Sequence, residues 1–117
     1  MFLDQQKLSE GLWGVLRDAG NELYLSAASA WEIAIKVRIG KMRLPNSAAL
    51  YVPRRARESN VFSLPVSEEH ALAVAELPLK HADPFDRILV AQAQLESLTL
   101  VTSDPAFREY DVKCVMV

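Results

Sequence analysis

Short apolar segments alternate along this chain with longer segments of helical periodicity, and this alternation constrains the fold more than any other feature. The apolar segments are 23–25, 61–64, 98–102 and 112–117. Runs of this length, bounded by turn-forming or helix-capping residues, are typical of strands buried on both faces. The pattern therefore predicts an α/β fold: an open parallel sheet flanked by helices on both faces.

The expected helices lie between these strands. They cover 8–19, a segment from Ser26 or Ser29 to Gly40, about 48–58 with a bend or interruption at Pro53, a segment from Ser67 that stops before Pro78, and a segment that starts at Asp83. Asp83-Pro84 is the strongest of the helix starts. An aspartate can cap the helix, and proline suits its first position.

Composition limits the remaining choices. With 117 residues, half of them hydrophobic, the chain suits a single domain over 1–117 with a substantial core. The net charge of -2 predicts no bulk attraction to nucleic acid, so a nuclease would depend on a local site. The single cysteine, Cys114, cannot form an internal disulfide, and no apolar run is long enough to span a bilayer. A cytoplasmic location without membrane contact is expected.

Three acids fall where an open α/β sheet places function. Glu32 follows the segment 23–25, Asp104 follows 98–102, and Asp86 lies in the first turn of the helix that leads into that last strand. Ligands of such sheets bind outside the carboxyl ends of the strands. Carboxylates suit Mg²⁺ or Mn²⁺, which can activate water for phosphodiester hydrolysis. Each acid alone is also consistent with an ordinary helix-terminal or turn residue.

These acids stand in three motifs that resemble a known family. The motifs are SAASAWEIAIK at 26–36, DPFDRILVAQA at 83–93 and LTLVTSDPAF at 98–107. In this order they resemble the PIN-domain ribonuclease toxins of VapBC-type, or type II, toxin–antitoxin systems. The resemblance implies a small PIN fold, a Mg²⁺- or Mn²⁺-dependent endoribonuclease acting on RNA, a homodimer, and inhibition by a cognate antitoxin protein.

Carried over residue by residue, the resemblance assigns Glu32, Asp86 and Asp104 as catalytic residues that hold metal directly or through water. Asp83 is more consistent with a helix cap than with a ligand. The hydroxyl groups of Thr102 and Ser103 could position a water or a ligand.

The chain departs from the family at its start, where the family has an apolar strand that ends in a further metal-site aspartate. In the preferred interpretation the N-terminal end is truncated and this strand is missing. In the second, Met1-Phe2-Leu3-Asp4 is the strand itself, the first helix is deleted, and Asp4 takes the place of the family's acid. An incomplete acid set would weaken metal binding. The alternative function is therefore a catalytically impaired PIN-like domain that only binds an antitoxin or RNA.

A group of cations follows the first motif. It comprises Lys36, Arg38, Lys41, Arg43, Arg54, Arg55 and Arg57. Solvated helix faces and phosphate contacts with RNA both account for it. His70 and His81 lack a partner at metal-ligand spacing, so zinc is not expected.

Overall fold

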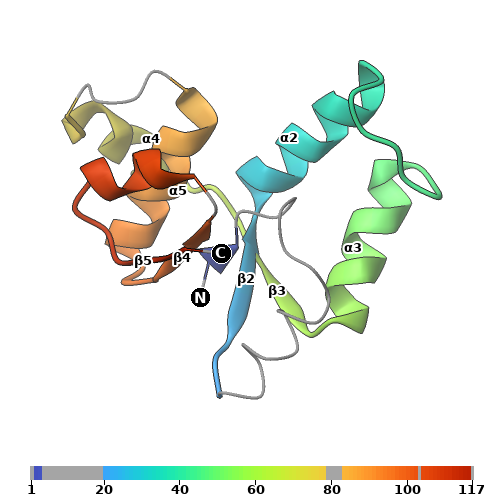
Figure 1. The fold of residues 1–117 in the computed structure, drawn as a ribbon, viewed down its shortest axis with the longest axis horizontal. Helices are drawn as coiled ribbons and strands as arrows, with labels where there is room; N and C mark the ends of the chain where they lie inside the picture. The colour runs from blue at the N-terminus through green and yellow to red at the C-terminus, as the bar shows by residue number, and fades with distance from the viewer. Residues whose placement is uncertain (1, 4–19, 79–82, 103, 117) are drawn as a thin grey trace.

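A single parallel sheet of five strands, in the order β3-β2-β1-β4-β5, organises the computed structural model, which describes residues 2–3, 20–78, 83–102 and 104–116 (Figure 1). The strands are β1 Phe2–Leu3, β2 Leu23–Ser26, β3 Val61–Leu64, β4 Leu100–Thr102 and β5 Cys114–Met116. The helices are α2 Ala27–Arg38, α3 Ala48–Glu58, α4 Glu68–Ala73 and α5 Pro84–Leu95, with 3-10 turns η1 Val74–Glu76 and η2 Pro105–Glu109. The predicted open parallel sheet is confirmed.

β1 lies at the centre of the sheet, and its described part is two residues long. Phe2 pairs with Tyr24 of β2 on one side and with Leu100 of β4 on the other, and Leu3 pairs with Val101. The expectation that the opening strand is missing is therefore wrong, and the strand that its alternative placed at the start of the chain agrees with the structure. The deletion of the first helix, which this alternative also proposed, falls on residues 4–19, outside the described part of the chain. Two residues give no periodicity, so only their pairing on both sides identifies them as a strand.

Successive strand residues point to opposite faces of the sheet, and both faces are covered. On one face, Tyr24 and Leu100 pack with residues of α5 in the larger core cluster. On the other, Leu23 and Val101 pack with Ala56 of α3 in a smaller cluster. Figure 1 shows α4 and α5 on one side of the sheet and α3 on the other. This confirms helices on both faces and explains why the strands read as continuous apolar runs.

Local capping chemistry sets the helix limits. Ser26, rather than Ser29, caps α2, because its side chain accepts a hydrogen bond from the backbone N–H of Ala28. The expected interruption at Pro53 does not occur, and α3 runs through it from Ala48 to Glu58. The proline removes one backbone hydrogen bond of the helix, and the residues on both sides of it stay helical. In the described ranges no helix has the length and apolar character needed to cross a membrane.

The helix predicted over 8–19 lies outside the described residues, as do Asp4, His81 and Ser103.

Candidate functional site

The helix α2 carries Glu32 away from the carboxyl end of β2. It begins directly after that strand, because Ser26 ends the strand and caps the helix. The Ser26 hydroxyl also donates to Gln92 Oε1 at 2.6 Å, which ties the junction to α5. Glu32 is half-buried, and its Oε1 lies 3.1 Å from Lys36 Nζ one helical turn later. The Glu32 carboxylate is therefore paired with the ammonium group of Lys36, and a metal ion could take the place of this cation.

The first turn of α5 brings two more acids to the same edge. Asp83 is the N-cap, and its Oδ1 accepts from the N–H of Phe85 at 2.9 Å, so the capping role predicted for it is confirmed. Asp86, one turn into the helix, is half-buried and forms part of the acidic first turn. Since α5 leads back to the start of β4, this first turn lies toward the carboxyl ends of the strands.

Asp104 follows β4 and caps η2. Its Oδ1 accepts from the N–H of Ala106 at 2.9 Å, and its own N–H donates to the hydroxyl of Thr102 at 3.0 Å. Thr102 is fully buried, so its hydroxyl fixes the turn that presents Asp104. Asp104 is therefore both a turn residue and an acid at the end of a strand. Its Oδ2 takes no part in the capping bond.

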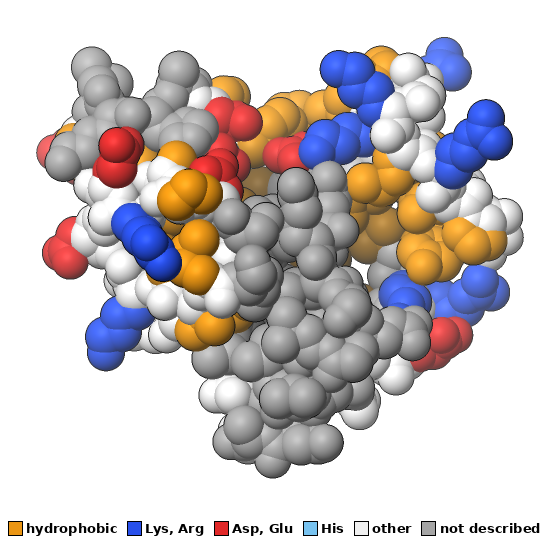
Figure 2. All heavy atoms as spheres, in the orientation of Figure 1, with side chains coloured by type: hydrophobic (Ala, Val, Ile, Leu, Met, Phe, Trp, Pro, Cys, Tyr) orange, Lys and Arg blue, Asp and Glu red, His pale blue; other side chains and the backbone are white. Residues whose placement is uncertain are grey.

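An aromatic contact joins the helices that carry Glu32 and Asp86. The rings of Trp31 and Phe85, each immediately before one of these acids, have centroids 4.9 Å apart with an edge-on inclination of 61°. Figure 2 shows acidic side chains near the upper centre of the face that it views. The segments of α2 and α5 that carry Glu32 and Asp86 therefore pack against each other.

The donor chemistry of this edge suits a hard divalent cation, but the described side chains do not complete a site. Among residues 2–3, 20–78, 83–102 and 104–116, no three acidic, histidine or cysteine side chains are grouped so as to hold a metal ion. Glu32 is turned to Lys36 and one oxygen of Asp104 is used in capping.

A cavity of about 430 Å³ lies beside the acids. Its lining is apolar and comes from the starts of α2 and α5 and from Val66; it includes Ala27, Ala28, Trp31, Pro84, Phe85 and Ile88. Trp31 itself is 63% exposed. The cavity supplies no ligand for a metal, and its character suits an apolar group of a bound molecule.

A buried polar network behind the edge was not predicted from the sequence. Gln92 is fully buried, and besides accepting from Ser26 its Nε2 donates to the carbonyl of Pro65 at 3.1 Å. His70 is also buried; its Nδ1 accepts from the N–H of Ser67 at 3.0 Å and lies 3.3 Å from Gln92 Nε2. His70 is thus a structural residue, and the network fixes α5 against the start of α2.

Arg87, next to Asp86, is the second feature that the sequence did not reveal. Its side chain is buried, and its guanidinium donates to the carbonyls of Pro78 at 2.9 Å and Val74 at 3.0 Å. Weaker contacts of 3.4 Å reach the carbonyl of Leu77 and the hydroxyl of Tyr110. An arginine that follows an acid in a helix looks like surface charge, and only packing shows that it anchors the start of α5.

Two titratable groups outside the acid set have shifted pKa values. The hydrogen bond from the Tyr24 hydroxyl to Glu22, at 2.7 Å, is the main cause of the raised pKa of Tyr24. Burial raises the pKa of the Cys114 thiol, and the nearby cation Arg108 opposes this shift. Neither residue is among the predicted ligands.

Comparison with known proteins identifies the class. The PIN domain family matches residues 2–113, so this chain belongs to the PIN domain family. It is similar to Ribonuclease VapC16 of Mycobacterium tuberculosis, with 46% identity over 56 residues, which are 48% of this chain and 40% of that relative. The match thus spans less than half of the relative's length.

Two solved structures share the fold. A chain in the structure of FitAB bound to an IR36 DNA fragment superposes with a TM-score of 0.67 and 21% identity, over 98% of this chain and 93% of that chain. A chain of FitAcB from Neisseria gonorrhoeae gives a TM-score of 0.61 and 23% identity, over 97% and 94%. The resemblance to PIN-domain toxins drawn from the sequence is thereby confirmed at the level of family and fold.

Proposed function

We propose that this chain is a Mg²⁺- or Mn²⁺-dependent endoribonuclease and the toxin of a type II toxin–antitoxin system. The observation that carries the proposal is the position of Glu32, Asp86 and Asp104 on three elements at one edge of a parallel sheet in a PIN domain. Similarity to a protein named as a ribonuclease supports the reaction class.

The three carboxylates would hold the cation directly or through water. A bound cation would activate a water molecule and stabilise the leaving oxygen of the phosphodiester. Binding requires Glu32 to leave Lys36, and an i,i+4 pair on a helix surface contributes only about 0.3–0.5 kcal/mol, so this rearrangement costs little. Asp83 remains a cap and is not assigned a ligand role.

The proposed partners are an RNA substrate, a cognate antitoxin and a second copy of the chain, in the cytoplasm. Several large apolar side chains are strongly exposed, among them Trp31, Leu50, Phe62 and Leu72. Exposed apolar surface of this kind supports association with another protein.

The second candidate function is a catalytically impaired PIN domain that only binds an antitoxin or RNA. It is favoured by one observation: the described side chains include no three grouped so as to hold a metal ion.

Cleavage of an end-labelled structured RNA in a Mn²⁺ titration separates the two functions. The wild-type chain is expected to cut the RNA only with metal, and Asp86→Asn is expected to abolish cutting. Asp111→Asn is the matched control, because Asp111 is exposed and lies in the loop before β5. If the wild-type chain does not cut the RNA at millimolar Mn²⁺, the proposed ribonuclease activity is wrong and the binding-only function remains.

A further inference from the structure

The charges of this chain are strongly segregated although its net charge is only -2. Between positions 36 and 57 there are seven Lys or Arg residues and no Asp or Glu. The remainder of the chain holds six Lys or Arg and fifteen Asp or Glu, a net charge of -9. We name the segment 36–57 the basic arm. A local anion-binding surface can therefore exist on a chain whose total charge predicts none.

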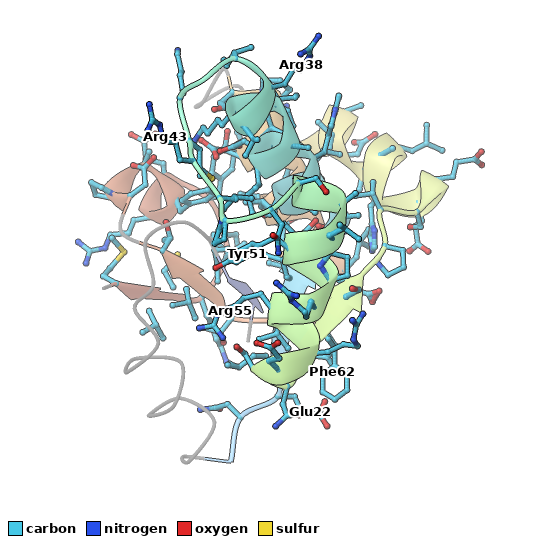
Figure 3. All side chains as sticks on the ribbon, turned by 90° about the vertical axis from the view of Figure 1, so that its right-hand side faces the viewer. Glu22, Arg38, Arg43, Tyr51, Arg55 and Phe62 are labelled. Atoms are coloured by element: carbon cyan, nitrogen blue, oxygen red, sulfur yellow. The ribbon has the colours of Figure 1, made fainter. Side chains whose placement is uncertain are left out.

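The structure places the basic arm over the last turn of α2, the loop that follows, and most of α3. Figure 2 shows basic side chains along the right-hand part of the molecule, where Figure 1 has α2 and α3. In Figure 3, Arg38 and Arg43 extend outward from the end of α2 and from the loop, above Arg55 on α3. In the view of Figure 2, the basic side chains on this side of the molecule form an upper and a lower group, with hydrophobic side chains between them.

Several of these cations are available for a ligand. Arg38, Lys41, Arg43 and Arg57 are exposed, and within the described part of the chain their side chains form no ion pair. Cations in the last turns of α2 and α3 are also favoured by the helix dipole, and the backbone N–H of Lys41 caps the end of α2 by donating to the carbonyl of Lys36 at 2.8 Å. Arg43 lies beyond this cap, in the loop, so its exposed cation is accessible to an external anion.

The basic arm begins at the acid edge. Lys36, its first residue, lies 3.1 Å from Glu32. Arg38 is six residues beyond Glu32, which corresponds to about 9 Å along the helix axis. A nucleic acid strand with one phosphodiester at the acids could therefore meet Lys36 on the same face of α2 and then Arg38, which lies about a third of a turn around the helix from Glu32.

We propose that the basic arm binds the phosphates of the same single-stranded RNA whose phosphodiester is cleaved at the acid edge, and so directs the strand along α2 toward the loop and α3. The inference rests on the proposed ribonuclease function and adds the path of the substrate. Phosphate contacts are independent of sequence, so the arm sets affinity and strand position while the choice of base is made elsewhere.

Binding of a short fluorescein-labelled single-stranded RNA, followed by anisotropy across about 50 to 200 mM salt, tests the inference. All proteins carry Asp86→Asn, so the RNA stays intact. The double variant Arg38→Gln/Arg43→Gln is compared with Arg108→Gln/Lys113→Gln, which removes the same charge from exposed positions outside the arm. Circular dichroism melting establishes that each variant is folded, and Arg43→Gln alone serves if the double variant is not.

Each lost phosphate contact should remove about 0.7 from the slope of log K against log salt, and about 5-fold in affinity near 0.1 M salt. The arm variant should therefore bind roughly 25-fold more weakly with a slope smaller by about 1.4, while the control pair changes affinity less than about 2-fold. Equal losses in both pairs, or no loss in the arm variant, would overturn the inference, and the latter would favour an acidic protein as the occupant of the arm.

The inference and the proposed function fail separately. If the wild-type chain cleaves RNA but the arm substitutions, made without Asp86→Asn, leave its KM unchanged, the substrate path is wrong and the enzyme stands. If the arm binds RNA as predicted but no metal-dependent cleavage occurs, the phosphate surface stands and the ribonuclease proposal falls.

Discussion

Replacing Arg87 with methionine removes a buried cation that joins the start of α5 to the segment before it. The guanidinium donates to the carbonyls of Pro78 at 2.9 Å and Val74 at 3.0 Å, with two contacts at 3.4 Å. Methionine retains an apolar stem of similar reach but donates no hydrogen bond. Arg87→Met therefore removes the donor from two partly buried hydrogen bonds.

The two short bonds decide the magnitude. Hydrogen bonds to charged groups contribute about 1.5–3 kcal/mol each, and the buried methionine stem offsets part of the loss. The free energy of unfolding should fall by about 3 kcal/mol, a large fraction of the roughly 5–15 kcal/mol that stabilises a domain. With a urea m value of about 2 kcal/mol/M, the unfolding midpoint should fall by about 1.5 M.

Urea unfolding followed by circular dichroism measures this midpoint. Tyr110→Phe is the control, because it removes only a hydroxyl 3.4 Å from Arg87, and it should cost less than about 1 kcal/mol. A free energy of unfolding for Arg87→Met within about 1 kcal/mol of wild type would refute the anchoring role, since the acceptors would then be satisfied without the guanidinium.

Three further predictions follow from single contacts. Glu32→Gln should change the free energy of unfolding by less than about 0.5 kcal/mol, because the ion pair of Glu32 with Lys36 contributes little. The same change should lower RNA cleavage more than about 100-fold. A large loss of stability would instead assign Glu32 a structural role. Ser67→Ala should cost about 1 kcal/mol in thermal unfolding, whereas Ser47→Ala, whose side chain makes no capping bond, should cost almost nothing. Alkylation of Cys114 at pH 8 should be slower than that of an exposed thiol, because its raised pKa leaves less thiolate, and Arg108→Gln should slow it further by removing the cation that lowers this pKa.

Local signals in the sequence were sufficient for the elements that cap themselves. The start of α5 follows from Asp83-Pro84, because the capping bond and the proline lie within three residues of each other. β3 could be delimited from its apolar residues and the flanking turn. The start of α5 and the limits of β3 depend on residues that are close together in the sequence, so the sequence alone is enough to predict them.

Features that depend on distant segments could not be predicted in the same way. β1 has two residues, and its place in the centre of the sheet comes from pairing with β2 and β4. The burial of Arg87 and Gln92 likewise results from packing of α5 against elements far away in sequence. The acids could be assigned to an edge from the strand order, but the directions of their side chains are set by local partners such as Lys36 and the N–H of Ala106.

Crystals of the chain soaked in millimolar Mn²⁺ and measured for anomalous scattering test the central claim most directly. The account predicts a peak at the carboxyl edge of the sheet, with carboxylate oxygens of Glu32, Asp86 and Asp104 coordinated to the ion directly or through one water, and with Glu32 released from Lys36. No peak there, or a peak bound by other acids while the Glu32–Lys36 pair stays closed, would contradict it.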